Sequence, residues 1–236
     1  MTGWVLVTGA ARRIGRAIAL ELAAGGFDII IHYHRSAAEA ERLAEEIIDL
    51  DQKAMLAEID LGNADLVGKL IPSLAAELGP LAALVNNASL FEPDAKDPDG
   101  ALHGAINATA PHLLSERFYQ QVPEGSTGCI VNLLDGMPPE HGFTAYNASK
   151  DRLKVDMLNM ARRFAPRVRV NGIAPGPILP NSRQSEQHFE AQVAATPLRT
   201  RIDPEDIASA AHFLIASPTI TGAILPVDGG MHLLGR

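Results

Sequence analysis

Residues 8–16 read TGAARRIGR and directly follow a short apolar run, Trp4–Val7. Gly9 allows a tight turn at the end of a strand, and Gly15 allows the following helix to pack closely on that strand. The free backbone N–H groups at the start of such a helix form an anion site. Arg13 stands where the middle glycine of a dinucleotide-binding turn is usual. The stretch predicts a strand–turn–helix unit that binds a phosphate group.

Short β-rich runs alternate with helical patterns along the whole chain. We expect strands at Trp4–Thr8, Asp28–Tyr33, Ala54–Glu58, Ala82–Asn86, Cys129–Leu134, Val168–Ile173 and Ala223–Val227. We expect helices at Ile14–Ala24, Ala37–Leu50, Ala64–Leu78, Leu102–Gln121, Tyr146–Phe164 and Pro204–Ala216. Several strands are apolar on both faces, which is typical of a parallel sheet covered by helices on each side. The pattern predicts an α/β fold, a single doubly wound Rossmann-type domain with a seven-stranded parallel sheet in the order 3-2-1-4-5-6-7 and helices on both faces.

The composition limits the class of protein. A chain of 236 residues suits one large α/β domain, here 1–236, and its apolar share of 47% and charged share of 20% are typical of soluble proteins. The net charge of −8 provides no general attraction for nucleic acid or for an anionic membrane. No apolar run approaches the roughly 18 residues of a membrane span, and no signal-peptide pattern is present. We expect a cytoplasmic protein.

Histidines and the cysteine give no sign of a metal or a disulfide. Cys129 is the single cysteine and cannot form an internal disulfide, and we expect a buried, unreactive thiol at the start of a strand. None of the eight histidines forms a His-x-x-x-His pair. We therefore expect no metal site. Two long segments rich in Pro, Gly and polar residues, 89–100 and 175–200, are predicted as loops that bind the substrate.

The end of the second strand indicates which nicotinamide cofactor is bound. Residues 32–36 read HYHRS, without the Asp or Glu that usually accepts from the ribose 2′-OH of NAD. His34, Arg35 and Ser36 can instead donate to a 2′-phosphate, and Arg12 can contribute from the neighbouring turn. Asp60, just after the third strand, is placed to meet the adenine edge. The sequence predicts NADPH as the cofactor.

Tyr146 and Lys150 are spaced i, i+4 at the start of a predicted helix, so the phenol and the ammonium lie on one helical face. A cation beside a phenol favours the phenolate. We expect Lys150 to lower the pKa of Tyr146 from about 10 toward the working pH, which makes the tyrosine a competent proton donor.

Over essentially its whole length the chain resembles the short-chain dehydrogenase/reductase family. The matching motifs are Thr8-Gly9…Gly15, Asn86-Asn87-Ala88, Asn107, Tyr146…Lys150, Pro175-Gly176 and Asp228-Gly229-Gly230. The resemblance implies that Tyr146 is the acid, that Lys150 binds the nicotinamide ribose, and that Asn107 helps to hold a proton-relay water. The expected cofactor-binding residues are Gly9, Arg12, Arg13, Ile14, Gly15, His34, Arg35, Ser36, Asp60, Leu61, Asn87, Ala88, Tyr146, Lys150, Pro175 and Gly176.

Departures from the common family pattern look like the pteridine reductases. Arg13 replaces a glycine, Ser89 follows Asn-Asn-Ala, and Asp135 stands where the catalytic serine is expected. Residues 178–181 (ILPN) and 228–233 (DGGMHL) look more like the bacterial dihydromonapterin/dihydrofolate reductases of that branch. The resemblance implies the following substrate contacts: Arg13 on cofactor phosphate and pterin, Ser89 on cofactor or pterin, Phe91 stacked on the pterin, and Asp135 working with Tyr146 in proton delivery.

The chemistry of Asp135 favours the same branch. An ionised carboxylate only accepts hydrogen bonds and repels the oxyanion that develops on a ketone, whereas a pterin offers N–H donors and a C=N bond whose nitrogen needs a proton. We therefore expect NADPH-dependent reduction of a dihydropteridine such as dihydromonapterin, dihydrofolate or dihydrobiopterin.

Other functions stay open at this point. A general carbonyl or 3-oxoacyl reductase is the first alternative, and a redox-sensing NADP-binding protein without catalysis is the second. By resemblance to the family, we also expect a homo-oligomer, as a dimer or a homotetramer.

Overall fold

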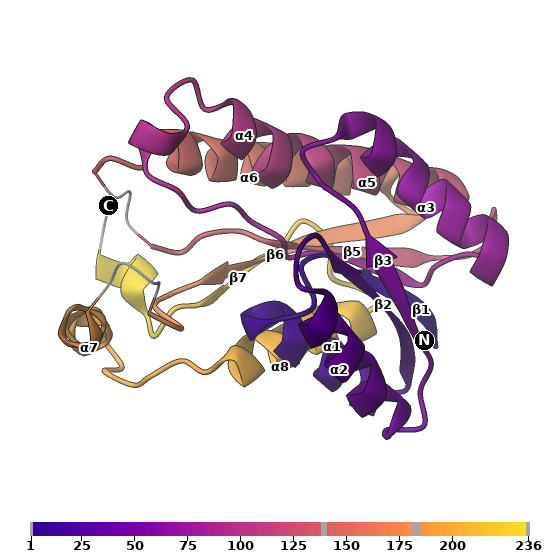
Figure 1. Cartoon of the computed structure of the whole chain (residues 1–236), viewed down its shortest axis with the longest axis horizontal. Coiled ribbons are helices and arrows are strands. Elements are labelled where there is room, and N and C mark those ends of the chain that lie inside the picture. The colour runs from indigo at the N-terminus through magenta and orange to yellow at the C-terminus, as the bar shows by residue number, and fades with distance from the viewer. Residues whose placement is uncertain (1, 138–140, 181–184, 235–236) are drawn as a thin grey trace.

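Seven strands form the centre of the molecule (Figure 1). The structure is a computed structural model that describes residues 2–137, 141–180 and 185–234. The sheet order is β3-β2-β1-β4-β5-β6-β7 and every neighbouring pair is parallel, which confirms the predicted fold class and strand order. The strands are β1 Gly3–Val7, β2 Phe27–Tyr33, β3 Ala54–Glu58, β4 Ala83–Asn86, β5 Gly128–Leu133, β6 Val168–Pro175 and β7 Ile224–Val227.

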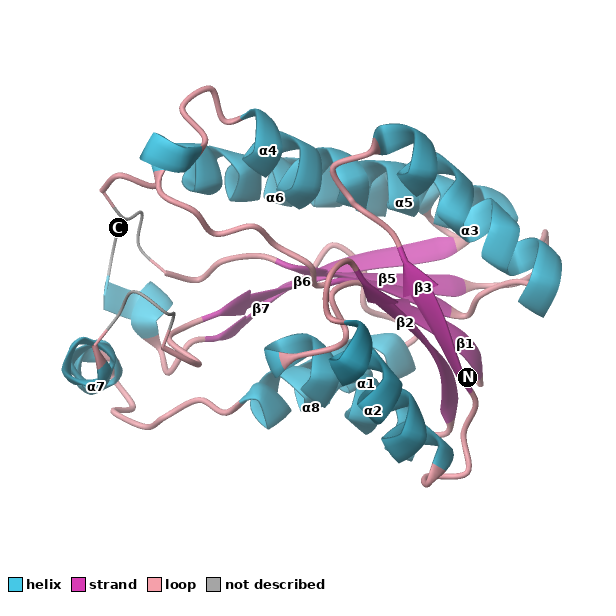
Figure 2. Cartoon of the chain, in the orientation of Figure 1, coloured by secondary structure: helices cyan, strands magenta, loops and turns pink. Residues whose placement is uncertain are grey.

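Helices cover both faces of the sheet (Figure 2). One face carries α1 (Arg13–Ala24), α2 (Ala37–Ile48) and α8 (Pro204–Ala216), and the other carries α3 (Ala64–Leu78), α5 (Ala110–Gln121) and α6 (Thr144–Phe164). Alternate residues of a central strand enter the two cores: Val5 and Val7 pack with α1 and α8, and Leu6 packs on the opposite side. This two-sided burial explains why the central strands are continuously apolar.

The helix predicted at Leu102–Gln121 is interrupted. A short α4 (Ala101–His103) leads into a π-helical segment, Gly104–Thr109, before α5 begins. A single wide turn does not disturb a hydrophobic pattern enough to be read from sequence, although such turns are common at functional sites. The π segment contains the fully buried Asn107.

One helix was not predicted. Residues Glu186–Ala195, inside the predicted loop 175–200, form α7, and the side chain of Ser185 caps it by accepting from the backbone N of His188 at 3.2 Å. Residues 181–184 of that loop lie outside the described residues. The loop 89–100 contains a short 3₁₀ turn, Asp94–Lys96, and another such turn, Met231–Leu234, follows β7.

Two further expectations concern the membrane and the cysteine. Within the described ranges, the structure has no helix with the length and apolarity of a membrane span. Cys129 lies fully buried in β5, as predicted, and burial raises the pKa of its thiol to about 11, which disfavours the reactive thiolate.

Candidate active site

The turn after β1 has the geometry of an anion site. Gly9 adopts a left-handed φ of 62°, and a Cβ on Gly15 would lie 2.2 Å from the Gly9 carbonyl oxygen, so both positions require glycine. Helix α1 begins at Arg13, has no side-chain cap from Arg12 and carries no acidic residue in its first turn. Its first N–H groups have no intrahelical acceptor, and they and the helix dipole are suited to bind phosphate.

Hydrogen bonds tie this turn to the end of β4. The Thr8 hydroxyl accepts from the backbone N of Asn87 at 2.9 Å and from that of Ala88 at 3.0 Å. In return, the Asn87 amide donates to the carbonyl oxygens of Thr8 at 2.8 Å and Gly9 at 3.2 Å. The Asn-Asn-Ala motif therefore holds the turn from the neighbouring strand.

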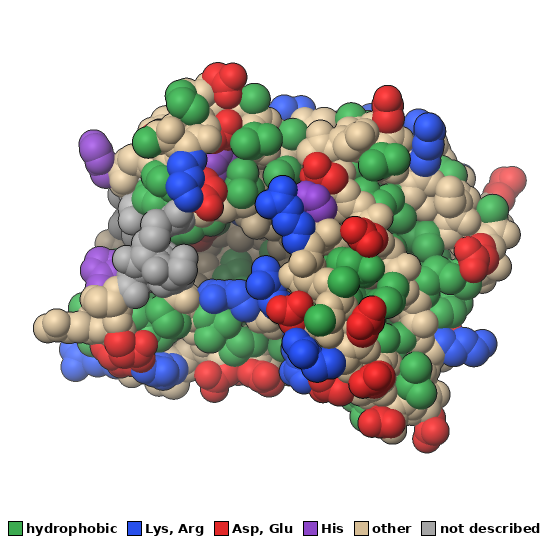
Figure 3. All heavy atoms as spheres, in the orientation of Figure 1, with side chains coloured by type: hydrophobic (Ala, Val, Ile, Leu, Met, Phe, Trp, Pro, Cys, Tyr) green, Lys and Arg blue, Asp and Glu red, His purple; other side chains and the backbone are tan. Residues whose placement is uncertain are grey.

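A groove with a volume of about 730 Å³ runs from this turn along the ends of β2 and β3. His34 and Asp60 face each other across it, with Nδ1 and Oδ1 3.9 Å apart, and Arg12 and Arg35 are exposed. Figure 3 shows a hollow between the two helix layers with Lys and Arg side chains at its rim. The groove brings together twelve of the predicted cofactor residues: Gly9, Arg12, Arg13, Ile14, Gly15, His34, Arg35, Ser36, Asp60, Leu61, Asn87 and Ala88.

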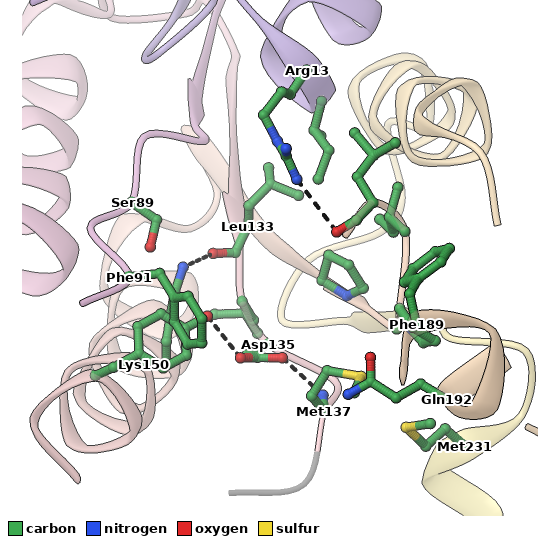
Figure 4. A pocket seen from close by; sticks show the side chains of 18 of the residues that line it. Arg13, Ser89, Phe91, Leu133, Asp135, Met137, Lys150, Phe189, Gln192 and Met231 are labelled. Atoms are coloured by element: carbon green, nitrogen blue, oxygen red, sulfur yellow. Dashed lines mark hydrogen bonds between the residues drawn. The ribbon is translucent and has the colours of Figure 1, made fainter. Parts of the chain in front are cut away.

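A second cavity, of about 630 Å³, adjoins the groove (Figure 4). It is lined by all five predicted substrate residues, Arg13, Ser89, Phe91, Asp135 and Tyr146, and by the remaining predicted cofactor residues, Lys150, Pro175 and Gly176. Four residues line both cavities: Arg13, Ile14, Asn87 and Ser89. A dinucleotide in the groove would therefore place its far end beside Tyr146.

Arg13 spans the junction of the two cavities. Its backbone adopts a left-handed φ of 54°, the conformation that glycine takes more easily. Its guanidinium donates to the carbonyl oxygens of Leu179 at 3.4 Å and Pro180 at 3.3 Å. The side chain thus crosses from the phosphate turn to the segment after β6.

Tyr146, Asp135 and Lys150 form the polar centre of the second cavity. The Tyr146 hydroxyl donates to Asp135 Oδ2 at 2.7 Å, and the other carboxylate oxygen accepts from the backbone N of Met137 at 2.8 Å. Lys150, 8% exposed, donates from Nζ to the Leu133 carbonyl oxygen at 2.9 Å. The structure therefore pairs the phenol with the carboxylate.

The prediction that Lys150 lowers the pKa of Tyr146 was wrong. Burial and the negative charge and hydrogen bond of Asp135 raise the pKa of Tyr146 well above its ordinary value. Lys150 Nζ lies 5.8 Å from the centre of the tyrosine ring and bonds to a backbone oxygen, while its own burial lowers its pKa to about 8. Tyr146 therefore keeps its proton at neutral pH and is a donor by virtue of its position.

Comparisons with known proteins agree with this geometry. The family model described as enoyl-(acyl carrier protein) reductase matches residues 9–232. The chain is 31% identical to a 3-oxoacyl-[acyl-carrier-protein] reductase of Synechocystis sp. (96% of this chain and 95% of that protein) and 31% identical to pteridine reductase 1 of Leishmania tarentolae (97% and 96%). The chain belongs to the short-chain dehydrogenase/reductase family. The family and enzyme class predicted from the sequence are therefore confirmed.

A solved structure extends the similarity to the pteridine branch of the short-chain dehydrogenase/reductases. The FolM alternative dihydrofolate reductase 1 of Brucella canis, complexed with NADP, is 36% identical to this chain and superposes with a TM-score of 0.91. The match covers 99% of this chain and 95% of that protein. The resemblance to the pteridine reductase branch is thus supported by both sequence and structure.

In this short-chain dehydrogenase/reductase, Phe91 lies against the tyrosine that the family motif marks. The Phe91 ring stacks on Phe143 with centroids 4.4 Å apart and meets the Tyr146 ring edge-on at 4.7 Å. The carboxylate of Asp94, from the same loop, accepts from the backbone N of Thr144 and of Ala145, both at 3.0 Å. The loop after β4 therefore caps the helix that carries Tyr146.

Sequence reasoning missed a buried pair that holds this loop. His103, fully buried, bonds through Nδ1 to Asp97 Oδ2 at 2.6 Å and accepts at Nε2 from the backbone N of Glu92 at 3.2 Å. A histidine in a helical pattern and an aspartate in a polar loop give no separate signal. Met137 and Met231 were also missed as pocket residues, whereas the predicted substrate loop 175–200 supplies Ile178, Leu179, His188, Phe189 and Gln192, which were not predicted individually.

Asn107 lies behind the cavities and lines neither of them. Its amide oxygen accepts from the Leu90 backbone N at 2.7 Å, and its NH₂ group donates to the Leu90 carbonyl oxygen at 2.9 Å and to the Ser149 hydroxyl at 3.0 Å. Both amide protons are thus used to fix Leu90 and α6.

As for metals, no group of three or more His, Cys, Asp or Glu suited to a metal ion occurs among the residues that the structure describes.

Proposed function

We propose that this protein is an NADPH-dependent reductase that reduces the C=N bond of a dihydropteridine such as dihydromonapterin, dihydrofolate or dihydrobiopterin. The observation that carries the proposal is the 2.7 Å hydrogen bond from the Tyr146 hydroxyl to the Asp135 carboxylate. A carboxylate at this point suits a ring with N–H donors and disfavours a developing oxyanion.

The cofactor assignment is supported by the donors along the groove. The start of α1 offers backbone N–H groups to the pyrophosphate, and His34, Arg35 and Ser36 offer donors to a 2′-phosphate. The Brucella canis relative is described as complexed with NADP. When bound, NADPH supplies the hydride; Lys150 would bind its nicotinamide ribose beside Tyr146.

The residues of the second cavity would hold the pterin and move a proton. Phe91 provides an aromatic face, and Arg13 a planar cation at the opposite side of the cavity. The ring carbon of the C=N bond accepts the hydride, and its nitrogen takes the proton that Tyr146 and Asp135 share. Solvent then returns one proton to the pair, so each turnover consumes one hydride and one proton.

The test is NADPH oxidation with a panel of dihydropterins and simple ketones at matched concentrations. We expect turnover with dihydropterins and little with ketones. Turnover of ketones alone would reject the proposal.

A general carbonyl or 3-oxoacyl reductase is the second candidate, and the Synechocystis sp. relative favours it. Such an enzyme needs a neutral donor beside Tyr146 to polarise a carbonyl oxygen. Among the described residues that line the second cavity, Ser89 is the only serine or threonine. Ser149 is buried and donates to the Tyr146 carbonyl oxygen instead. The ketone arm of the panel tests this candidate.

We further propose a cytoplasmic homotetramer. Val155 on α6 is 57% exposed and lines neither cavity, which suits a contact between copies. Light scattering of the purified protein should give four times the chain mass; a monomer at all concentrations would contradict the assembly.

A further inference from the structure

A buried imidazole lies directly beneath the phosphate turn. His32, at the end of β2, is 2% exposed. Its Nδ1 accepts from the backbone N of Gly9 at 3.0 Å, and its carbonyl oxygen accepts from the backbone N of Ala10 at 2.9 Å. On the other side of the ring, Nε2 lies 3.1 Å from the Ile59 carbonyl oxygen.

The partners determine the tautomer of this ring. The Gly9 N–H can only donate, so Nδ1 is unprotonated, and the Ile59 carbonyl can only accept, so Nε2 carries the proton. Burial lowers the pKa of His32 to about 4, and the ring stays neutral at physiological pH. Both ring nitrogens are therefore satisfied by backbone groups.

The two backbone groups lie at different parts of the groove. Gly9 opens the turn that faces the pyrophosphate, while Ile59 immediately precedes Asp60 and Leu61, which line the adenine side. The ring thus connects two segments that come from different strands, β1 and β3, across the strand that lies between them. It also directs the Gly9 N–H into the protein, so the phosphate is left to the N–H groups at the start of α1.

We propose that His32 is a positioning residue for the ADP half of NADPH, because its imidazole fixes the phosphate turn relative to the adenine wall. This inference rests on the NADPH-binding part of the proposed function. The residue does not touch the reacting atoms. Its replacement should therefore lower the affinity for NADPH and leave the rate of the chemical step unchanged at saturating NADPH.

Three substitutions separate the two hydrogen bonds. In His32→Asn, the amide oxygen lies close to the place of Nδ1 and can accept from Gly9; in His32→Gln, the amide NH₂ reaches toward Ile59; His32→Leu does neither. Ile30→Val is the matched control, because Ile30 is a fully buried residue on the same face of the same strand, and its apolar side chain makes no hydrogen bond to the turn.

The affinities for NADPH and for 2′,5′-ADP are measured by calorimetry, with the KM for the dihydropterin and kcat at saturating NADPH. We expect His32→Asn and His32→Gln, which each lose one buried hydrogen bond, to weaken both ligands about tenfold, and His32→Leu, which loses both, to weaken them further. Ile30→Val should stay close to the parent protein, and kcat and the KM for the pterin should be unchanged in all four.

The outcomes distinguish the two claims. If the parent protein binds neither NADPH nor 2′,5′-ADP, the proposed function fails; if it binds both and His32→Leu or His32→Gln binds them equally well, the positioning role fails. If His32→Leu does not fold, nitrogen NMR of the parent protein tests the role of His32 by reporting which ring nitrogen carries the proton. The account requires a neutral ring at pH 7 with the proton on Nε2, and a proton on Nδ1 would overturn it.

Discussion

The cofactor groove and the substrate cavity are built in different ways. The groove is formed at the ends of β1, β2 and β4, which are hydrogen-bonded neighbours in the sheet, and short polar groups such as Thr8, His32 and Asn87 tie these ends together. The substrate cavity is closed by longer segments from outside the sheet, as in the contact of Asp94 with the start of α6 and the stacking of Phe91 on Phe143.

This difference indicates where the specificity for each ligand resides. A turn held by strand ends has little freedom, so the groove is ready for a nucleotide and its selectivity depends on a few side chains at the end of β2. Loops that follow strands vary more easily, and they carry the groups that choose the substrate. Changes in the groove should therefore alter cofactor affinity, and changes in the cavity should alter turnover or the KM for the substrate.

The largest effect is expected on the cavity side, from Tyr146→Phe. Loss of the proton donor should lower kcat about 10²–10⁴-fold, while the dissociation constant for NADPH stays unchanged. Tyr119→Phe is the control, because Tyr119 stacks on Phe164 and lines neither cavity. Kinetics and calorimetry on both variants measure this; a Tyr146→Phe enzyme with nearly full activity would place the proton transfer elsewhere.

Asp135→Asn should lower kcat with the dihydropterin about 10²-fold, since the carboxylate is expected to share the transferred proton. Removing its negative charge should also lower the pKa of Tyr146, because that charge helps to raise it. The alkaline limb of the pH–rate profile should then move to lower pH. Asp151→Asn, an exposed neighbour on α6, is the control. A limb that moves to higher pH would contradict the pairing.

On the groove side, Arg35→Ala should weaken NADPH relative to NADH about tenfold, the effect of one charge-assisted hydrogen bond. The KM for the dihydropterin at saturating NADPH should not change. Arg42→Ala, exposed on α2 and absent from the groove lining, is the control. Calorimetric titration with the two cofactors measures the ratio, and an unchanged ratio would remove Arg35 from the 2′-phosphate site.

The smallest effect is expected from Asp94→Asn. The carboxylate holds the loop that carries Phe91 against the start of α6, so its loss should raise the KM for the dihydropterin about fivefold through misplacement of the loop, with NADPH affinity unchanged. Asp99→Asn, in the same loop, bonds its near neighbour Ala101 and serves as the control. Steady-state kinetics measure the KM values of both variants. If Asp94→Asn weakened NADPH binding alone, the groove and the cavity would not act separately, which would contradict the account.

The same distinction governs what could be predicted from the sequence. The sheet order, the Gly9–Gly15 turn and the residues along the groove follow local patterns, and the structure places them together as expected. Contacts between loops have no such pattern: nothing local links Asp94 to Thr144, or His103 to Asp97 and Glu92.

Burial also changes chemistry in ways that spacing does not reveal. The i, i+4 spacing correctly brings Lys150 near Tyr146, but the ammonium donates its hydrogen bond to the Leu133 carbonyl oxygen and the phenol donates to Asp135. The pKa of Tyr146 therefore moves opposite to the direction predicted from the pair alone. Helix α7 was missed because its polar sequence carries a weak apolar stripe, with Phe189 and Val193 as its buried residues.

The most direct test of the central claim is transfer of deuterium from NADPH labelled at the reactive carbon of the nicotinamide to a dihydropterin, read by NMR of the product. The account predicts one deuterium per turnover on the ring carbon of the former C=N bond, with the nitrogen protonated from solvent. A product that carries no deuterium, from an enzyme that transfers the label to a simple ketone, would contradict it.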